Sequence, residues 1–461
     1  MPDFEPLYTS EEMREAEAGH DTAVLMERAG GEAARLALQV FPGAERWTVV
    51  CGGGANGGDG HVVARHLVEA GKDVLLVDAK GGEAELGEPH VIVDALFGTG
   101  FKGEPRAHAA ALIGRMNASG ARVFAIDIPS GVDASTGEVP GAAVTADETV
   151  TFHGRKVGLV VAPGRFHAGR VHVADIGLDP HETVGARLAT AELLLSVPRR
   201  MEGDNKYTAG HVLVVGGSRG LTGAPSLSAL AALRADVGYV TVAAPESALP
   251  VLEQRLLEAV KRPLPDEGGL VAEGTAEVVR ELALRAHAVA LGPGLGRGPG
   301  PQALVRAVLQ QVELPVVVDA DALYQLAPGT WPAPRVLTPH EGELARLLER
   351  SSKEVAAHRV ASAREAVERF GCVVLLKGPD TLIAAPERGL IVCSLGLPSL
   401  ATAGTGDVLT GIVASFLAKG MEPQLAAAAA AVAQQLASVE APQRAGLIAS
   451  DLIDALPRVL A

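Results

Sequence analysis

The chain has 461 residues, of which 48% are apolar and 21% are charged, and its formal net charge is −15. A chain of this length and composition is expected to be soluble and to fold as two or three domains, each with its own core. The acidic balance and the lack of any Lys/Arg cluster argue against nucleic-acid binding, because phosphates would be repelled. Aromatic residues are only 3%, which favours α/β packing around parallel strands rather than an aromatic sandwich core.

The cysteines and the apolar segments indicate where the protein resides. Cys51, Cys372 and Cys393 are far apart and odd in number, which argues against a disulfide framework and against zinc, and favours a reducing compartment. The first residues lack a basic start followed by an apolar core, and the longest apolar run, 425–439, is mostly alanine interrupted by glutamine. We therefore expect a cytoplasmic protein that contacts no membrane. An Ala-rich helix of this kind packs either between subunits or within a core, and we expect a homo-oligomer.

The first half of the chain reads as a βαβ series. Its strands end in Asp or in a loop, as expected where a parallel sheet exposes its carboxyl ends to a ligand. The predicted elements are a helical region at 9–40 that begins near Ser10 and Glu12, strands at 47–51, 73–78, 90–96, 122–128 and 147–152, a glycine loop at 52–60 and a helix at 61–71.

The amino-acid composition becomes polar and turn-rich around 187–210, and we place a domain boundary there. The expected domains are 1–198 and 199–461, both α/β with a three-layer αβα arrangement. The second half again alternates strands with helices, and its loops differ from those of the first half, so the halves are not repeats. Its predicted strands are 211–217, 239–244, 288–292, 315–321, 335–339 and 372–378, all parallel candidates.

The glycine loop of the first half leaves two interpretations open. Gly52, Gly54 and Gly57 match the dinucleotide-binding spacing, and Asp78 ends the next strand where a ribose-binding acid is expected. This favours a plain dehydrogenase. Against it, Asp59 stands at the helix start where the pyrophosphate would dock, and a carboxylate there would repel the pyrophosphate.

Polar residues follow two further strand ends. Asp94 precedes a glycine turn, and Asp127 and Ser130 flank the tight turn at Pro129. Together with Asn56, the oxygens of Asp94 and Ser130 would suit a hard cation, although such residues commonly only cap and bend the chain.

Five segments of the first half occur in the order found in one known family: MERAG (26–30), GGGANGGDG (52–60), DALFGTGFKG (94–103), DIPSGVD (127–133) and TFHGRKVGL (151–159). This half resembles the NAD(P)H-hydrate epimerases. The resemblance implies a Rossmann-like domain that interconverts the R and S epimers of hydrated NAD(P)H at the nicotinamide C6, with a bound potassium ion. It implies Asn56, Asp94 and Ser130 as potassium ligands, and Asp127 as the residue that binds the substrate and acts on it. The substrate-binding residues that it implies are Ala55, Asn56, Gly57, Gly58, Asp59, Gly98, Thr99, Gly100, Phe101, Lys102, Gly103, Glu104 and Asp127.

Two points qualify this half. Ala55 departs from the family, which usually has a second asparagine there, so one polar contact is lost. Epimerising a carbinolamine carbon requires either loss and return of the hydroxyl or ring opening, and each route needs a positioned proton carrier such as Asp127. Both routes stay open.

The run Ala403-Gly404-Thr405-Gly406-Asp407 precedes the apolar stretch 408–420. Its glycines let the backbone approach an oxygen-rich group, and the first amides of the following helix have no internal acceptor, so phosphate is favoured there. Asp407 adds a carboxylate that can accept a proton or hold a metal, which suits a hydroxyl attacking a phosphoryl group. An Asp-capped glycine turn without function has the same pattern.

Six segments of the second half occur in the order of another family: residues 211–243, GPGLG (292–296), DADAL (319–323), TPHEGE (338–343), LLKGPDT (375–381) and ATAGTGDVLTG (401–411). They resemble the ADP- or ATP-dependent NAD(P)H-hydrate dehydratases, which are ribokinase-like. The resemblance implies that the C6 hydroxyl of the S epimer is phosphorylated by the nucleotide, and that phosphate then leaves to restore NAD(P)H. It implies hydrate contacts at Ala224, Gly294 or Gly296, His340 and Asp407, with Asp407 as base, and nucleotide contacts at Lys377, Gly378, Pro379, Asp380, Thr381, Gly404, Thr405 and Gly406.

Some residues of the second half keep a second interpretation. Asp319 and Asp321 either cap a helix or help to hold Mg²⁺, and His340 could equally be structural. Pro225, Asp236 and Ala403 stand where the family usually has small residues, but none of these departures removes a proposed catalytic group.

The sequence thus predicts a bifunctional metabolite-repair enzyme that uses hydrated NAD(P)H and an adenine nucleotide. One rival is a ribokinase-like small-molecule kinase whose first half is a ligand-binding regulator. Another is a non-catalytic nucleotide sensor, which would not need an Asp at the helix mouth.

Overall fold

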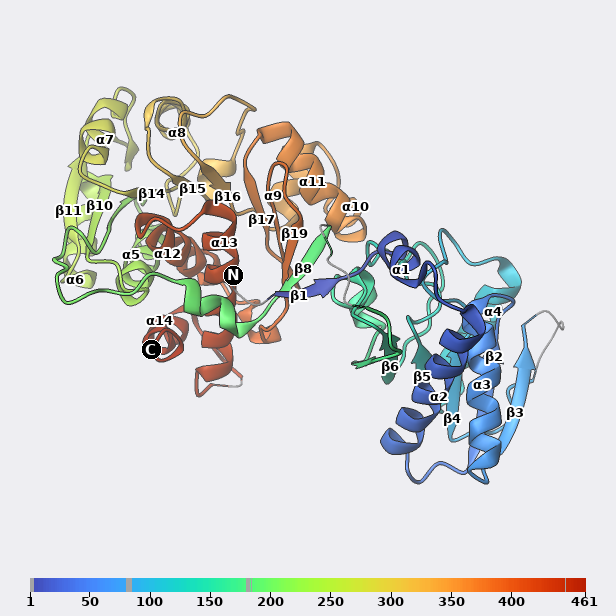
Figure 1. Cartoon of the computed structure of the whole chain (residues 1–461). Coiled ribbons are helices and arrows are strands. Elements are labelled where there is room, and N and C mark those ends of the chain that lie inside the picture. Colours follow the sequence, from blue (N-terminus) through green and yellow to red (C-terminus); the bar gives the residue numbers. More distant parts are fainter. Residues whose placement is uncertain (1–3, 80–84, 180–182, 184, 444) are drawn as a thin grey trace. The chain divides into compact units, whose positions relative to one another are not determined.

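The computed structural model describes residues 4–79, 85–179, 183, 185–443 and 445–461. The chain divides into two compact units, a smaller one with residues 6–187 and 356–359 and a larger one with residues 1–5, 188–355 and 360–461. Each unit is a mixed α/β structure built around its own parallel sheet (Figure 1).

The smaller unit is built on a six-stranded sheet of order β3-β2-β4-β5-β6-β7, in which every neighbouring pair is parallel. The predicted strands of the first half are confirmed to within two residues at each end, and β7 adds an edge strand. Its elements are α1 (Ser10–Glu17), α2 (Thr22–Val40), β2 (Arg46–Cys51), α3 (Ala55–Glu69), β3 (Asp73–Asp78), β4 (Val91–Ala95), α4 (Ala107–Ala118), β5 (Arg122–Ile126), β6 (Glu148–Phe152), η1 (Val157–Leu159), η2 (Gly164–Phe166) and β7 (Arg170–Ala174).

Helices cover both faces of this sheet. On one face α2 and α3 pack on Val49, Val93 and Phe124, and on the other face α4 packs on alternate residues of the same strands, such as Val50 and Ile92. This alternation follows from the two-residue period of a strand and gives the expected three-layer αβα arrangement. The cavity described below therefore lies between helices at the end of a sheet that is buried on both faces.

The helix predicted at 61–71 begins earlier than expected, at Ala55, so the prediction of a loop over 52–60 is wrong from residue 55 onward. A run so rich in glycine has low helix propensity. Here close packing decides instead: a Cβ on Gly57 would lie 1.9 Å from the carbonyl oxygen of Gly52, and a Cβ on Gly58 would lie 2.5 Å from the Met26 side chain. Only glycine lets the first turn of α3 approach its surroundings so closely.

The larger unit is built on an eleven-stranded sheet of order β1-β8-β19-β18-β17-β16-β15-β14-β9-β10-β11. The six strands predicted for the second half are all confirmed and are parallel to one another, whereas β18 and β19 continue the sheet antiparallel. The strands outside the six-stranded sheet, of which β12 and β13 form a separate two-stranded sheet, are β1 (Phe4–Leu7), β8 (Ala186–Ala189), β9 (His211–Val215), β10 (Tyr239–Pro245), β11 (Val260–Leu264), β12 (Asp266–Glu267), β13 (Leu270–Val271), β14 (Ala288–Leu291), β15 (Val316–Val318), β16 (Arg335–Leu337), β17 (Val373–Leu376), β18 (Thr381–Ala384) and β19 (Leu390–Cys393).

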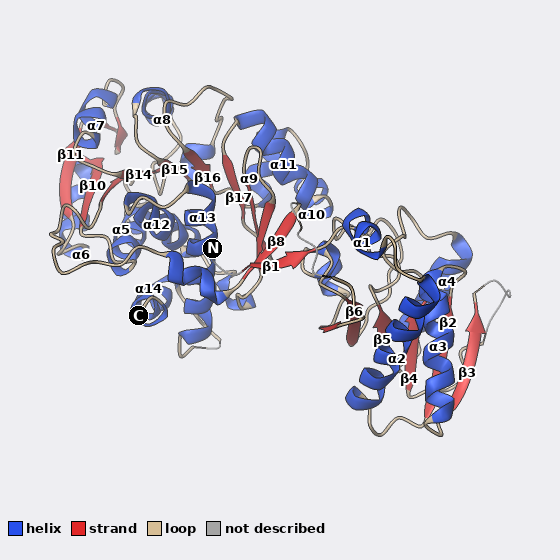
Figure 2. Ribbon diagram, viewed as in Figure 1, coloured by secondary structure: helices blue, strands red, loops and turns tan. Residues whose placement is uncertain are grey.

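Helices flank this second sheet as well (Figure 2). One face is covered by α5, α12, α13 and α14, which share one core with the strands, while α7, α8, α9 and α11 lie on the other side (Figure 1). The helices are η3 (Ala191–Ser196), α5 (Gly223–Arg234), η4 (Glu246–Ala248), α6 (Leu249–Arg255), α7 (Ala276–Ala283), α8 (Pro299–Gln311), η5 (Ala320–Leu323), α9 (Glu341–Leu348), α10 (Ser352–Ala357), α11 (Arg359–Phe370), η6 (Pro398–Leu400), α12 (Thr405–Ala418), α13 (Pro423–Glu440) and α14 (Ala449–Val459).

The Ala-rich segment forms α13, and its alanines from Ala426 to Ala430 are completely buried within the chain itself. The helix therefore packs within the core, which is one of the two alternatives for this segment. Cys51, Cys372 and Cys393 are buried and unpaired. None of the helices in the described part of the chain is both long enough and apolar enough to span a membrane.

The close packing of Gly57 in the first turn of α3 gives a stability prediction. Replacing Gly57 by Ala puts a methyl group against the Gly52 carbonyl, and we expect a loss of about 1–3 kcal/mol in the free energy of unfolding. Gly54→Ala is the matched control, because a Cβ there meets no atom within 4 Å, and we expect it to cost less than Gly57→Ala. Urea unfolding followed by circular dichroism compares the two, and equal stability of both variants would contradict the packing argument.

Candidate active sites

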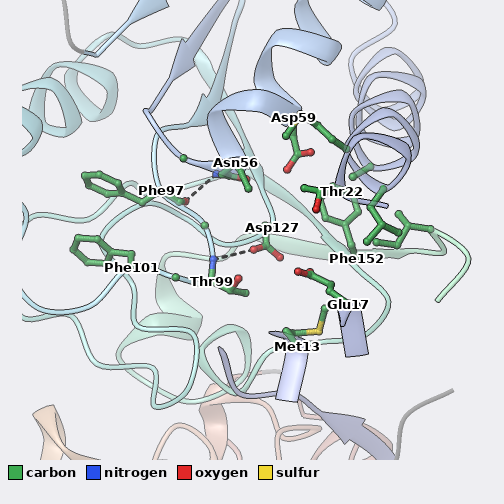
Figure 3. Close-up of a pocket in the computed structure, with 18 of the residues that line it drawn as sticks. Met13, Glu17, Thr22, Asn56, Asp59, Phe97, Thr99, Phe101, Asp127 and Phe152 are labelled. Carbon is green, nitrogen blue, oxygen red and sulfur yellow. Dashed lines mark hydrogen bonds between the residues drawn. The ribbon is translucent and has the colours of Figure 1, made fainter. Parts of the chain in front are cut away.

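A cavity of about 490 Å³ lies at the carboxyl ends of the strands in the smaller unit. Its walls come from the segments that follow β2, β4, β5 and β6, and α1 and α2 contribute Met13, Glu17 and Thr22 (Figure 3). This is the edge that the sequence predicts. The first turn of α1 is fixed by a capping box between Thr9 and Glu12, so the helix that carries Glu17 starts at a defined residue.

Asp127 is the best-anchored acid in this cavity. Its backbone has φ 68°, a left-handed conformation that a non-glycine residue adopts only where surrounding contacts enforce it. Its Oδ2 accepts a hydrogen bond from the Thr99 N–H at 3.0 Å, and its Oδ1 lies 3.0 Å from the Lys156 ammonium. Lys156 is fully buried, and it also donates to Thr151 Oγ1 at 2.9 Å and to the Phe152 carbonyl at 2.8 Å.

Two more carboxyl groups point into the same space (Figure 3). Burial raises the pKa of Asp59 to about 8, with a further contribution from the charges of Asp127 and Glu17. Burial also raises the pKa of Glu17, and the charge of Asp127 adds to this effect while Lys156 opposes it. Asp59 is therefore protonated at neutral pH.

A group of oxygens suited to a monovalent cation lies behind the cavity. The Asn56 amide donates to the Phe97 carbonyl at 2.9 Å, while its Oδ1 is buried without a hydrogen-bond partner. Asp94 is fully buried, and burial raises its pKa to about 6 although Ser130 donates to it through both its hydroxyl and its backbone N–H. The Asn56 amide and the Ser130 hydroxyl both donate to the Phe97 carbonyl, and a buried amide oxygen without a hydrogen-bond partner fits a hard cation.

The predicted residues of this half divide into three groups. Those that line the cavity are Ala55, Asn56, Asp59, Gly98, Thr99, Gly100, Phe101 and Asp127. Gly57 and Gly58 instead pack behind the wall, and Lys102, Gly103 and Glu104 lie exposed in the loop that continues from it. A Cβ on Gly98 would meet Asn56 at 3.1 Å and Asp127 Oδ2 at 3.2 Å, so this glycine keeps the two side chains accessible.

Sequence reasoning gave no role to Lys156 or Glu17. Lys156 lies within TFHGRKVGL, and a lysine among apolar residues after a strand is a signal for a buried cation, but only the fold shows that it faces Asp127. Glu17 gave no such signal, because it is one of several glutamates on α1.

In the larger unit the segment around Asp407 has the predicted geometry. Gly404 is the N-cap of α12 with φ 88°, so the chain turns through a conformation that favours glycine and then enters the helix. Asp407 lies in the first turn. Burial and the charges of Asp319, Asp321 and Glu343 together raise its pKa to about 7, and the charge of Lys377 acts in the opposite direction. A carboxyl group with this pKa is well suited to accept a proton near neutral pH.

Lys377 lies between two acids next to this helix. Its ammonium is 2.9 Å from Asp319 Oδ1 and 4.0 Å from Glu343. Burial alone lowers the pKa of Lys377, but the two carboxylates outweigh burial and raise it. A Cβ on Gly406 would lie 3.2 Å from the ammonium, so the lysine lies directly beside the first turn of α12.

The two aspartates after β15 have defined partners. Asp319 accepts hydrogen bonds from Thr338 and Thr410 in addition to Lys377, and it makes no helix-capping bond with its side chain. Asp319 thus occupies the N-cap position of η5, but its side chain does not cap that helix. Asp321 accepts from the Gly296 N–H and from Arg297, both at 2.9 Å, so it holds the GPGLG loop. Both oxygens of each carboxylate therefore already accept at least one hydrogen bond from the protein.

His340 has a structural role that the sequence left open. It is the N-cap of α9, where its Nδ1 accepts from the Gly342 N–H at 3.0 Å. Its side chain is nevertheless 57% exposed, and its Nε2 lies 3.5 Å from Glu343 Oε1. The capping bond fixes the orientation of the ring.

The remaining predicted residues of this half lie in loops that follow neighbouring strands. A Cβ on Gly294 would lie 3.3 Å from Ala224, so the loop after β14 lies against the start of α5. Gly378 and Pro379 are exposed, whereas Asp380 and Thr381 are buried at the start of β18. Pro225 packs on Gly217. Asp236 pairs with Arg200 and with Lys419, which is the C-cap of α12, at the opposite end of that helix from Asp407.

Comparisons with known proteins agree with this geometry. Residues 212–458 match the family described as NAD(P)H-hydrate dehydratase, and residues 22–87 and 76–158 match the family described as YjeF-related protein N-terminus. The bifunctional NAD(P)H-hydrate repair enzyme of Moorella thermoacetica is 39% identical, over 95% of this chain and 92% of the relative. The corresponding enzyme of Escherichia coli is 36% identical, over 95% and 89%.

Solved structures match the larger unit. The ADP/ATP-dependent NAD(P)H-hydrate dehydratase of Bacillus subtilis, co-crystallised with ATP and Mg²⁺, is 28% identical with a TM-score of 0.52, and covers 60% of this chain and 98% of that chain. A ribokinase-like superfamily protein of Enterococcus faecalis, 24% identical with a TM-score of 0.53 over 61% and 98%, shares the fold. The fold and the sites thus define an α/β enzyme with a ribokinase-like part. The chain belongs to the family of bifunctional NAD(P)H-hydrate repair enzymes, and the resemblance found in its sequence is confirmed.

The raised pKa of Asp407 makes stability depend on pH. Between the ordinary value of 3.8 and about 7, the folded chain keeps a proton that the unfolded chain releases, so stability falls as pH rises through this window. Asp407→Asn removes this loss. We expect the variant to exceed the wild type by roughly 1–3 kcal/mol at pH 8 and to match it near pH 4. Urea unfolding at the two pH values measures the difference, and the same difference at both would contradict the shift.

Proposed function

We propose that the chain carries out both steps of NAD(P)H-hydrate repair. Residues 1–198 interconvert the R and S hydrates at C6, and residues 199–461 dehydrate the S hydrate with ADP or ATP, releasing phosphate and AMP or ADP. The observation that carries the proposal is that one chain places a carboxyl group suited to each step, Asp127 and Asp407, at its two sheet edges. The proposed cytoplasmic location and homo-oligomeric state remain predictions.

In the epimerase part, the cavity holds the nicotinamide end of the hydrate. Residues Ala55 to Asp59 and Gly98 to Glu104 form or support the substrate-binding walls, and Ala55 makes no polar side-chain contact there. Asp127 is the proton carrier, since Lys156 and the Thr99 N–H fix its two oxygens. Asn56, Asp94 and Ser130 would hold potassium, which would supply positive charge and orient the oxygens around the cavity.

In the dehydratase part, Asp407 accepts the proton of the C6 hydroxyl as its oxygen attacks the terminal phosphoryl group of the nucleotide. The amides of Gly404, Thr405 and Gly406 at the start of α12 hold the transferred group, because a helix N-terminus favours negative charge. Phosphate then leaves more readily than hydroxide, and the ring nitrogen donates its electron pair to C6 as the C6–O bond breaks. Loss of a proton from the neighbouring C5 then restores the ring double bond. Lys377 to Thr381 bind the nucleotide, and Ala224, Gly294, Gly296 and His340 contact the hydrate.

Magnesium enters this scheme with the nucleotide. Because Asp319 is occupied by Lys377 and two threonine hydroxyls, we propose that Mg²⁺ is held by the nucleotide phosphates rather than by Asp319 or Asp321.

The two activities are separable by single substitutions. Asp127→Asn should lower epimerisation by about 10²–10⁴-fold and leave dehydration of the S hydrate intact, and Asp407→Asn should do the reverse. The measurement follows the R and S hydrates of NADH separately by chromatography, with and without ADP or ATP. Recovery of nicotinamide absorbance identifies dehydration. Nucleotide consumption that gives a stable phosphorylated product without that recovery would instead support a small-molecule kinase.

The pKa of Asp407 predicts the pH profile of the dehydratase. Because the base must be ionised, kcat/KM for the S hydrate should fall by about tenfold per pH unit below the pKa of about 7. Steady-state rates measured between pH 5 and 9 test this, with Asp236→Asn, outside the site, as a control that keeps the profile. A flat profile down to pH 5 would rule out Asp407 as the base.

A further inference from the structure

Four titratable side chains line the cavity of the smaller unit in the described part of the chain: Glu17, Asp59, Asp127 and Lys156. Three acids thus share one cation. The cation is not shared equally, because Lys156 is 3.0 Å from Asp127 and its other bonds go to Thr151, Phe152 and Gly154. Lys156 therefore forms its ion pair with Asp127, and its charge also acts on Glu17.

Asp127 is held by two donors. One of its oxygens faces the buried ammonium, and the other accepts the Thr99 N–H. Charge-assisted hydrogen bonds of this kind fix the carboxylate in the cavity.

The environment of Asp59 is different. It lies in the first turns of α3 on the wall of the same cavity, and its carboxyl points into the cavity that Asp127 also lines (Figure 3). Burial and the neighbouring carboxylates raise its pKa to about 8, so it holds a proton at pH 7. Two carboxyl groups that face one cavity from unlike environments are candidates for an acid and a base.

Both possible routes of epimerisation need such a pair. If the hydroxyl is lost, the acid protonates the C6 oxygen, the C6–O bond breaks with its electrons on the departing water, and the ring nitrogen donates its pair to C6. Water then adds to the other face and the base takes its proton. If the ring opens, the base takes the hydroxyl proton as the C6–N bond breaks and the acid protonates the nitrogen; reclosure reverses these transfers. In either route one proton is given and one is taken.

We propose that Asp59 is the proton donor of the epimerase reaction, and that Lys156 is a positioning residue that reserves Asp127 as the base. This inference rests on the proposed epimerase function. Glu17 is not assigned as the acid, because it is the last residue of α1 and is more exposed than Asp59, whereas Asp59 lies on a helix packed against the sheet.

The first test compares two isosteric substitutions. Asp59→Asn should lower kcat for epimer exchange by about 10²-fold or more at pH 7 with little change in KM, because a proton donor acts in the transition state. Glu17→Gln is the matched control and should stay within about tenfold of the wild type. A wild-type rate in Asp59→Asn, or a loss in Glu17→Gln alone, would overturn the assignment.

The second test concerns Lys156. Lys156→Met should move the acid-side fall of epimerase kcat/KM to higher pH by about 1–3 units, since the base loses its cation, and Lys156→Arg should restore the wild-type position. A residue needed only for packing would lower the rate equally at every pH, and an unshifted profile in folded Lys156→Met would overturn the positioning role. If circular dichroism shows that Lys156→Met does not fold, the Asp59 test decides the proposal.

Measurements on the wild-type protein distinguish a failure of this inference from a failure of the proposed epimerase function. Without any epimer exchange in the wild type, the proposed function fails. Exchange in the wild type together with unaffected variants refutes the inference alone. Dehydration of the S hydrate in each variant serves as an internal control for the intact chain.

Discussion

A lysine held against an aspartate underlies each of the two sites. Lys156 lies 3.0 Å from Asp127 and Lys377 lies 2.9 Å from Asp319, each at the carboxyl edge of a parallel sheet. An ammonium group buried without a partner would cost several kcal/mol, so each lysine requires its carboxylate, and each pair fixes the loops that carry it. The remaining acids of each site, Asp59 and Asp407, have no such cation to themselves, and their pKa values are raised to about 8 and about 7.

The arrangement of parallel strands explains how one chain can hold sites for two different reactions. Parallel strands direct the segments that follow them to one edge, so residues far apart in sequence meet there. In the smaller unit this edge collects three carboxyl groups around one lysine, which suits proton transfer in both directions. In the larger unit it places an acid of near-neutral pKa on the first turn of a helix, where free amides favour a phosphoryl group. The difference in chemistry therefore comes from the loops rather than from the sheets.

The strands were predicted well because apolar runs rich in β-branched residues and bounded by glycine or aspartate favour strands through local sequence alone. The start of α3 was misplaced, since the helical state of residues 55–60 depends on the approach of Gly57 and Gly58 to Gly52 and Met26. A glycine run has the same local propensity in a loop and in a close-packed first turn, and only the neighbouring strands decide between them.

The sequence by itself determined the α/β class, the order of the strands along the chain, the family, and the acids that follow the strands, because these depend on composition, period and motif. Only the tertiary structure decided which charges face each other. It brought Lys156 to Asp127, assigned Asp319 to Lys377 rather than to a helix cap, left the Asn56 oxygen without a partner, and packed α13 within the core. Charge interactions fall with distance and depend on burial, and neither quantity is encoded in the order of residues along the chain.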